Sequence, residues 1–219
     1  MRNTNKRLLD AYQRMSDFFG PCHWWPAESP WEVMVGAILT QNTAWSNVEK
    51  AISRLKSQNC LAPQSLIDSQ EEILWEIIRA SGYFRQKSKK LKTLAQYFQG
   101  RYSGSIEIMR RADLRDLRQE LLGVHGIGPE TADSILLYAL EKPIFVVDAY
   151  TRRIFSRHKF FPAKNSYESI QAYFMERLPA DVPLYNEYHA LIVFTGKHFC
   201  RTQPRCEGCP LNGFQKQSP

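Results

Sequence analysis

Glycine and proline gather in one stretch of this 219-residue chain, Leu121 to Leu136, with the sequence LLGVHGIGPETADSIL. Pro129 suits the first turn of a helix, where its missing N–H costs nothing. Glycines let the backbone approach a ligand closely, and the start of the following helix presents N–H groups to an anion. The stretch therefore predicts a phosphate-binding turn; an ordinary turn between two helices is the alternative. Its candidate residues are Gly126, Ile127, Gly128 and Thr131.

One carboxylate, Asp148, stands between the apolar run Ile144 to Val147 and the basic segment Ala149 to Arg157. An aspartate at such a boundary commonly caps a helix. At the mouth of a pocket, the same group can stabilise positive charge that develops in a transition state, or it can activate water. Asp148 is the candidate catalytic residue, and helix capping is the alternative.

Two adjacent indoles, Trp24 and Trp25, precede a strongly apolar segment. Such rings can stack on an electron-poor aromatic ligand through cation–π attraction. Core or hinge residues are the alternative.

Three of the five cysteines, Cys200, Cys206 and Cys209, are spaced as metal ligands are. The other two are Cys22 and Cys60, and an odd number argues against a disulfide framework. His198 is a candidate fourth ligand, because three cysteines and one histidine also make an ordinary zinc site.

Apolar residues recur at helical spacing along most of the chain, separated by Pro and Gly. Trp31 to Leu39 is apolar on nearly every side, as a buried central helix would be. Only Ile144 to Val147 resembles a strand, and it is too short to support a sheet. We therefore predict an all-α fold of about ten helices.

The 29 Lys and Arg residues exceed the 22 Asp and Glu residues, so the net charge is +7 and nucleic acid is the expected partner. A 43% hydrophobic composition excludes a disordered chain. The apolar runs are shorter than the roughly 18 residues that a membrane span needs, so no membrane association is expected. The basic N-terminal segment lacks the apolar core of a secretory signal, so we expect a cytoplasmic, nucleoid-associated protein.

The residues around the glycine turn, Leu-Leu-Gly-Val before it and Thr-Ala-Asp-x-Ile-Leu after it, resemble the helix–hairpin–helix of the endonuclease III-like (HhH-GPD) DNA glycosylases. Four more stretches match the family in order: Gly36 to Thr43, Ser81 to Lys87, Pro143 to Arg153 and the C-terminal cysteines. The match covers roughly residues 20 to 210, and the 3-methyladenine DNA glycosylase III type is the most similar. The resemblance implies two helical lobes with the flipped base in the cleft between them. Residues 27–140 would form a helical barrel with the hairpin motif at about 113–137. Residues 1–26 plus 141–219 would form the second lobe, with the cysteine cluster at 198–209.

The resemblance also implies roles for single residues. The family places its catalytic aspartate at the position of Asp148. Trp24 and Trp25 match a base pocket, and Gln41 and Asn42 match residues that fill the gap left by an extruded base; a helix C-cap is their alternative. Tyr83 would be the wedge that separates base pairs, with a buried tyrosine as the alternative.

Bifunctional members of the family carry a lysine two positions after the hairpin glycine, where this chain has Glu130. A carboxylate cannot form a Schiff base. The resemblance therefore implies a monomeric, monofunctional glycosylase that releases N-alkylated purines from double-stranded DNA containing a damaged base. The alternatives are an endonuclease III-type enzyme for oxidised pyrimidines or abasic sites, and a non-catalytic DNA-binding module.

The family's metal motif has four cysteines and holds a [4Fe-4S] cluster. This chain is one residue short in the first gap, and Gln215 stands at the place of the fourth cysteine. An iron–sulfur cluster is the favoured expectation, with zinc or no metal as alternatives.

Overall fold

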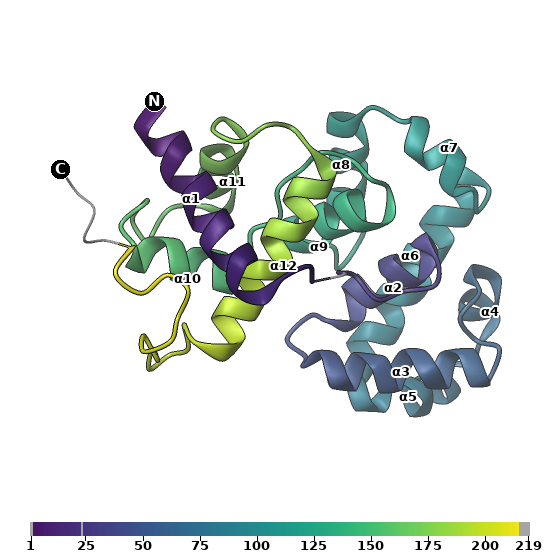
Figure 1. Ribbon diagram of the computed structural model, residues 1–219. Helices are drawn as coiled ribbons and strands as arrows, with labels where there is room; N and C mark the ends of the chain where they lie inside the picture. The colour runs from purple at the N-terminus through teal and green to yellow at the C-terminus, as the bar shows by residue number, and fades with distance from the viewer. Residues whose placement is uncertain (1, 23, 215–219) are drawn as a thin grey trace. The chain divides into compact units, whose positions relative to one another are not determined.

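The computed structural model describes residues 2–22 and 24–214, and this part of the chain is all-helical, which confirms the predicted fold class (Figure 1). The helices are α1 (Arg2–Phe19), α2 (Pro30–Leu39), α3 (Trp45–Ser57), α4 (Pro63–Asp68), α5 (Glu71–Ile78), α6 (Phe84–Tyr102), α7 (Ile106–Arg111), α8 (Leu114–Gly123), α9 (Pro129–Ser134), α10 (Ala149–Arg157), α11 (Tyr167–Met175) and α12 (Val182–His198). A 3-10 turn, η1 (Arg79–Ser81), and a π-helical segment, η2 (Ile135–Ala139), complete the described helical elements. None of the described helices has both the length and the apolar character of a membrane span.

Contacts within the chain define two compact units, which we call the central unit (Ala27–Lys142) and the terminal unit (Met1–Pro26 with Pro143–Pro219). The central unit contains α2 to α9 with η1 and η2, and the terminal unit contains α1, α10, α11 and α12. The glycine turn therefore lies in the central unit. Asp148, the two tryptophans and the last three cysteines lie in the terminal unit.

Helix α2 is the core of the central unit. Every residue from Trp31 to Leu39 is buried, as expected of a segment that is apolar on all sides. The Ser29 side chain caps the helix by accepting a hydrogen bond from the Glu32 N–H, and Pro30 occupies the first turn. Helices α3, α6 and α9 and segment η2 pack against α2. The chain that leaves α2 at Thr40 therefore emerges next to the start of α9.

Helices α8 and α9 flank the glycine turn. Asp113 caps α8, and its Oδ1 accepts hydrogen bonds from the N–H groups of Arg115 (2.8 Å) and Asp116 (3.3 Å). Helix α9 begins at Pro129 and continues directly into η2. Helix α9 packs against α8 and α2, so the turn between α8 and α9 rests on buried helices.

Helix α12 is the core of the terminal unit and packs against α1 and α10. Tyr185 and Tyr188 are fully buried on it. The Tyr188 hydroxyl donates to the Leu8 carbonyl at 2.7 Å, which joins α12 to α1. These contacts fix α10, the helix that begins after Asp148.

The strand-like segment Ile144 to Val147 is buried but does not form a strand in the described structure. Side chains of α11 take the place of a neighbouring strand. Gln171 Nε2 donates to the Phe145 carbonyl at 2.7 Å, and the Val147 N–H donates to the Tyr167 hydroxyl at 3.3 Å. The apolar run therefore reflects burial, and the segment carries the chain into Asp148.

Candidate active site

Asp148 is the N-cap of α10. Its Oδ1 accepts hydrogen bonds from the Thr151 N–H (2.6 Å) and the Thr151 hydroxyl (2.8 Å). The carboxylate side chain is 10% exposed, so it is largely desolvated. Its other oxygen, Oδ2, faces His189. The capping and catalytic interpretations are therefore compatible, because the cap engages only one of the two oxygens.

His189, on α12, is a site residue that the sequence analysis missed. Its Nε2 lies 3.8 Å from Asp148 Oδ2, and its side chain is 7% exposed. Burial lowers the pKa of His189, although the Asp148 carboxylate acts in the opposite direction. A neutral imidazole leaves the negative charge of Asp148 available to a developing cation. The signal in the sequence is a lone histidine inside an apolar helix, which is more often a core residue.

The two glycines of the turn differ in backbone conformation and in the space available for a side chain. Gly126 has φ +87°, and a Cβ at this position would collide with the stem of Lys90. Gly128 has φ −94°, and a Cβ there would meet no protein atom within 4 Å. Ile127, between them, is buried and anchors the turn. Gly126 therefore determines the shape of the turn, whereas Gly128 presents open backbone.

Gln41 supports this turn from within the central unit. Its Nε2 donates to the Gly126 carbonyl (3.0 Å) and to Thr131 Oγ1 (3.0 Å), while its Oε1 accepts from Lys90 Nζ (2.6 Å). Thr131 is only 7% exposed, and its hydroxyl is directed to Gln41. Any phosphate contact of Thr131 would therefore fall to its backbone N–H, because its side chain is internal. Ordering this turn is a role of Gln41 that the sequence analysis did not include.

Tyr83 and Asn42 are surface residues with left-handed backbone conformations. Tyr83 is 66% exposed and has φ +46° at the position before α6, so the alternative of a buried tyrosine is excluded. Asn42 is exposed, has φ +53°, and follows the C-cap of α2, which is Thr40. Gln41 and Asn42 therefore lie beyond the helix cap. Non-glycine residues in this backbone region are uncommon, more so for tyrosine than for asparagine.

Trp24 and Trp25 are half-buried in the terminal unit. Their ring centroids lie 5.8 Å apart with an interplanar angle of 69°, and Trp24 meets Phe194 of α12 edge-to-face at 6.3 Å. The Trp24 contact attaches the pair to the core helix α12. Because the two indole planes are steeply inclined, one planar ligand can stack on only one of them.

Glu130 and Lys87 lie in two motif stretches of the central unit. Glu130 is exposed in the first turn of α9, where bifunctional relatives have lysine. Lys87 is 2% exposed, and its Nζ donates to the Leu39 carbonyl (2.7 Å), Thr43 Oγ1 (2.6 Å) and the Ser81 carbonyl (2.7 Å). Burial lowers the pKa of Lys87 to about 8. Lys87 therefore ties the loop after α2 to η1, a structural role.

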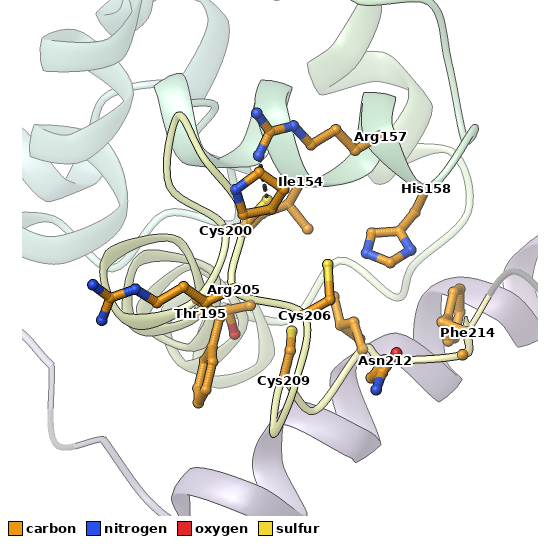
Figure 2. A pocket seen from close by; sticks show the side chains of 14 residues that line it. Ile154, Arg157, His158, Thr195, Cys200, Arg205, Cys206, Cys209, Asn212 and Phe214 are labelled. Atoms are coloured by element: carbon orange, nitrogen blue, oxygen red, sulfur yellow. Dashed lines mark hydrogen bonds between the residues drawn. The ribbon is translucent and has the colours of Figure 1, made fainter.

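The last three cysteines line one cavity of about 370 Å³ in the terminal unit (Figure 2). Cys200 is buried, and its Sγ accepts from Arg157 Nη1 at 3.3 Å. Arg153 Nε donates to the Cys200 carbonyl at 2.6 Å. Cys209 is half-buried and Cys206 is exposed. The cysteine loop is therefore attached to α10 by two arginines of that helix.

The histidine at this cavity is His158. His158 follows the last residue of α10, and its Nδ1 is buried without a hydrogen-bond partner among the described residues. The predicted His198 does not line the cavity: it is exposed, and its ring stacks on Phe194 with centroids 6.1 Å apart. In the described part of the chain, no three His, Cys, Asp or Glu residues are close enough together to hold a single ion. Gln215 lies outside the described residues.

Residues 35–180, which include the glycine turn and Asp148, match the HhH-GPD superfamily of base excision DNA repair proteins. The chain belongs to this superfamily. The inferred resemblance is therefore confirmed, and with it the identity of the enzyme as a DNA N-glycosylase of base excision repair.

Individual relatives agree with this assignment. MJ1434 of Methanocaldococcus jannaschii, a protein assigned as a DNA repair glycosylase, is 44% identical over 97% of both chains. The structure of a trapped endonuclease III–DNA covalent intermediate superposes with a TM-score of 0.82 at 23% identity, covering 98% of this chain and 99% of the other, which shows a shared fold. The H. pylori 3-methyladenine DNA glycosylase MagIII, bound to 1,N6-ethenoadenine, superposes with a TM-score of 0.74 at 26% identity, covering 89% of this chain and 97% of the other.

Proposed function

We propose that this HhH-GPD glycosylase hydrolyses the bond between deoxyribose and an N-alkylated purine in duplex DNA, and that it leaves an intact abasic site. The observation that carries the proposal is Glu130, an exposed carboxylate at the hairpin position where a lyase needs an amine. Lys87, which lies in another motif stretch of the central unit, has all three ammonium donors in hydrogen bonds. Water is then the nucleophile that completes the reaction.

Asp148 supplies the chemistry. As the N-glycosidic bond lengthens, positive charge develops on the sugar, and a desolvated carboxylate stabilises it. Thr151 holds Oδ1 through two hydrogen bonds, so the carboxylate is oriented before the substrate arrives. The oxygen outside the cap, Oδ2, is the atom that we assign to the sugar cation or to the attacking water. His189, kept neutral by burial, does not cancel that charge.

The preference for an alkylated purine is supported by Trp24 and Trp25. An alkylated purine carries positive charge, which favours stacking on an indole face. The inclined rings leave one indole to stack on the base and the other to form the edge of the pocket. MagIII, whose structure is similar, is a 3-methyladenine glycosylase bound to an ethenoadenine base.

The central unit would grip the DNA. Open backbone at Gly128 suits close approach to a phosphate, and the Gln41 hydrogen bonds keep the turn in shape. Tyr83, exposed on a left-handed turn, suits the wedge that enters the base stack, and the neighbouring exposed Asn42 suits the filling of the gap.

We also propose that the cysteine cavity holds a [4Fe-4S] cluster. The four iron atoms of a cluster each take one protein ligand, so the donors are spread around a larger body. Three cysteines that line one cavity of about 370 Å³ fit that arrangement. The cluster would stabilise the fold of the loop that carries the three cysteines.

The test is base release from duplexes that each carry one defined lesion, measured in single turnover. We expect release of 3-methyladenine or a related alkylpurine, with strand cleavage only after heat or alkali. Cleavage at the rate of base release, or a preference for oxidised pyrimidines, would instead identify an endonuclease III-type enzyme.

A further inference from the structure

We infer that His158 is the fourth protein ligand of the metal centre in the cysteine cavity. The inference rests on the cluster proposed above and adds a ligand that the cysteine pattern does not predict. It would give this chain a centre held by three thiolates and one imidazole, in place of four thiolates.

The first argument is the set of side chains around the cavity. Apart from Cys200, Cys206 and Cys209, its lining consists of apolar groups, two arginines, a threonine, an asparagine and His158. Arginine carries no lone pair for a metal, whereas neutral imidazole is a common ligand of iron. His158 is therefore the lining side chain best suited to the position that the cysteines leave open.

The second argument is the state of the His158 ring. Its Nδ1 is buried and has no hydrogen-bond partner among the described residues. Buried polar atoms in proteins nearly always have a partner, so a ring nitrogen beside three cysteines that finds none among the described residues is open to a bound group in the cavity. Figure 2 shows the His158 ring and the sulfurs of Cys206 and Cys209 directed toward the same space.

The third argument is how firmly the ring is held. His158 is the C-cap of α10, and its backbone N–H donates to the Ile154 carbonyl at 3.0 Å. Arg7 donates to the His158 carbonyl at 3.4 Å, and Phe214 meets the ring edge-to-face with centroids 5.9 Å apart. A ligand fixed by backbone and packing contacts is placed before the metal arrives.

The contacts of Phe214 support the same assignment. In the family pattern the fourth cysteine follows Cys209 by six positions, where this chain has Gln215. Phe214, next to that position, is buried, lines the cavity and contacts the His158 ring. Phe214 thus packs against His158, which comes before the three cysteines in the sequence, whereas the family's fourth cysteine comes after them.

The experiment uses the full chain, purified without oxygen, with iron and acid-labile sulfide measured together with electron paramagnetic resonance spectra. Wild type should contain a full [4Fe-4S] complement. Its reduced cluster should show a nitrogen-14 hyperfine coupling from a bound imidazole. His158→Cys should keep the iron content and lose that coupling, because a thiolate takes the place of the imidazole. His158→Ala should lose one iron on oxidation and give a [3Fe-4S] signal.

His198→Ala is the matched control, because His198 lies in the same unit, is exposed and does not line the cavity; its spectrum should equal that of wild type. A wild-type cluster without nitrogen coupling would overturn the inference, as would a His158→Ala cluster that keeps its four irons. A wild-type chain that binds no iron would overturn the cofactor proposal itself. The two failures are distinguishable, since the second appears before any variant is made.

Discussion

Replacement of Asp148 by asparagine should separate the two functions of this carboxylate. Asparagine is as good an N-cap as aspartate, and its Oδ1 can accept the same two hydrogen bonds from Thr151. Asp148→Asn should therefore unfold within about 0.5 kcal/mol of wild type. Asp148→Ala also loses the cap and should cost about 1 kcal/mol in folding free energy.

The chemical effect should be much larger. A unit charge about 4 Å from the sugar cation, at an effective dielectric constant of about 20, contributes about 4 kcal/mol. Since about 1.4 kcal/mol corresponds to a factor of ten in rate, base release should fall on the order of 10² to 10³-fold in Asp148→Asn. Affinity for lesion DNA should stay within about tenfold, because phosphate contacts dominate binding.

The assay is single-turnover release of a labelled alkylpurine at saturating enzyme, with binding and thermal unfolding measured on the same preparations. Asp181→Asn is the matched control. Asp181 caps α12 in the same unit, and its Oδ1 accepts from the Leu184 N–H at 2.7 Å. A near wild-type rate for Asp148→Asn would remove this carboxylate from the mechanism. An equal loss of rate in Asp181→Asn would show that the effect comes from charge in general.

Three further predictions concern the turn, the lyase step and the pH profile. Gly126→Val should lower the free energy of unfolding by at least about 1 kcal/mol, measured by denaturation, because a β-branched residue is strained in the left-handed region. Gly128→Ala should fold normally and should weaken binding to all duplexes alike, measured by titration at several salt concentrations. Borohydride should trap no covalent DNA adduct in wild type on denaturing gels; a trapped adduct would contradict the proposed hydrolysis. Protonation of His189 places a cation 3.8 Å from Asp148, so base release should fall in acid. Because burial lowers the pKa of His189, this acidic fall in the rate of base release should occur below pH 6.5, the ordinary pKa of histidine being about 6.5. The pH at which the rate falls should shift in His189→Gln.

The sequence predicts the helical fold and the residues of the turn well, because both depend on local signals. Apolar periodicity identifies α2 as a buried helix, and Pro129 marks the start of α9. Asp148 is found at a boundary between apolar and basic residues, where caps occur. The strand-like run before it shows the limit of such signals, since four buried apolar residues look alike in a strand and in an extended segment paired with side chains.

The residues that support these groups could not be predicted, because their partners are distant in sequence. Gln41 meets Gly126 across 85 positions, and Cys200 meets Arg157 across 43. His189 and His158 stand in segments whose patterns only indicate ordinary helices. Ligand spacing is read along the chain and therefore points to His198, whereas the histidine that lines the cavity is His158, the C-cap of α10.

Helix α10 connects the proposed catalytic carboxylate to the cysteine cavity of the terminal unit. Asp148 caps its first turn, His158 follows its last, and nine residues between them make a helix about 14 Å long. Arg153 and Arg157, on the same helix, hold the loop that carries Cys200. A helix is stiff over this length, so anchoring its C-terminal end also restricts the carboxylate at its start. Under the proposed function, a metal centre in the cysteine cavity would not need to transfer electrons to affect base release, since fixing α10 would help to keep Asp148 oriented.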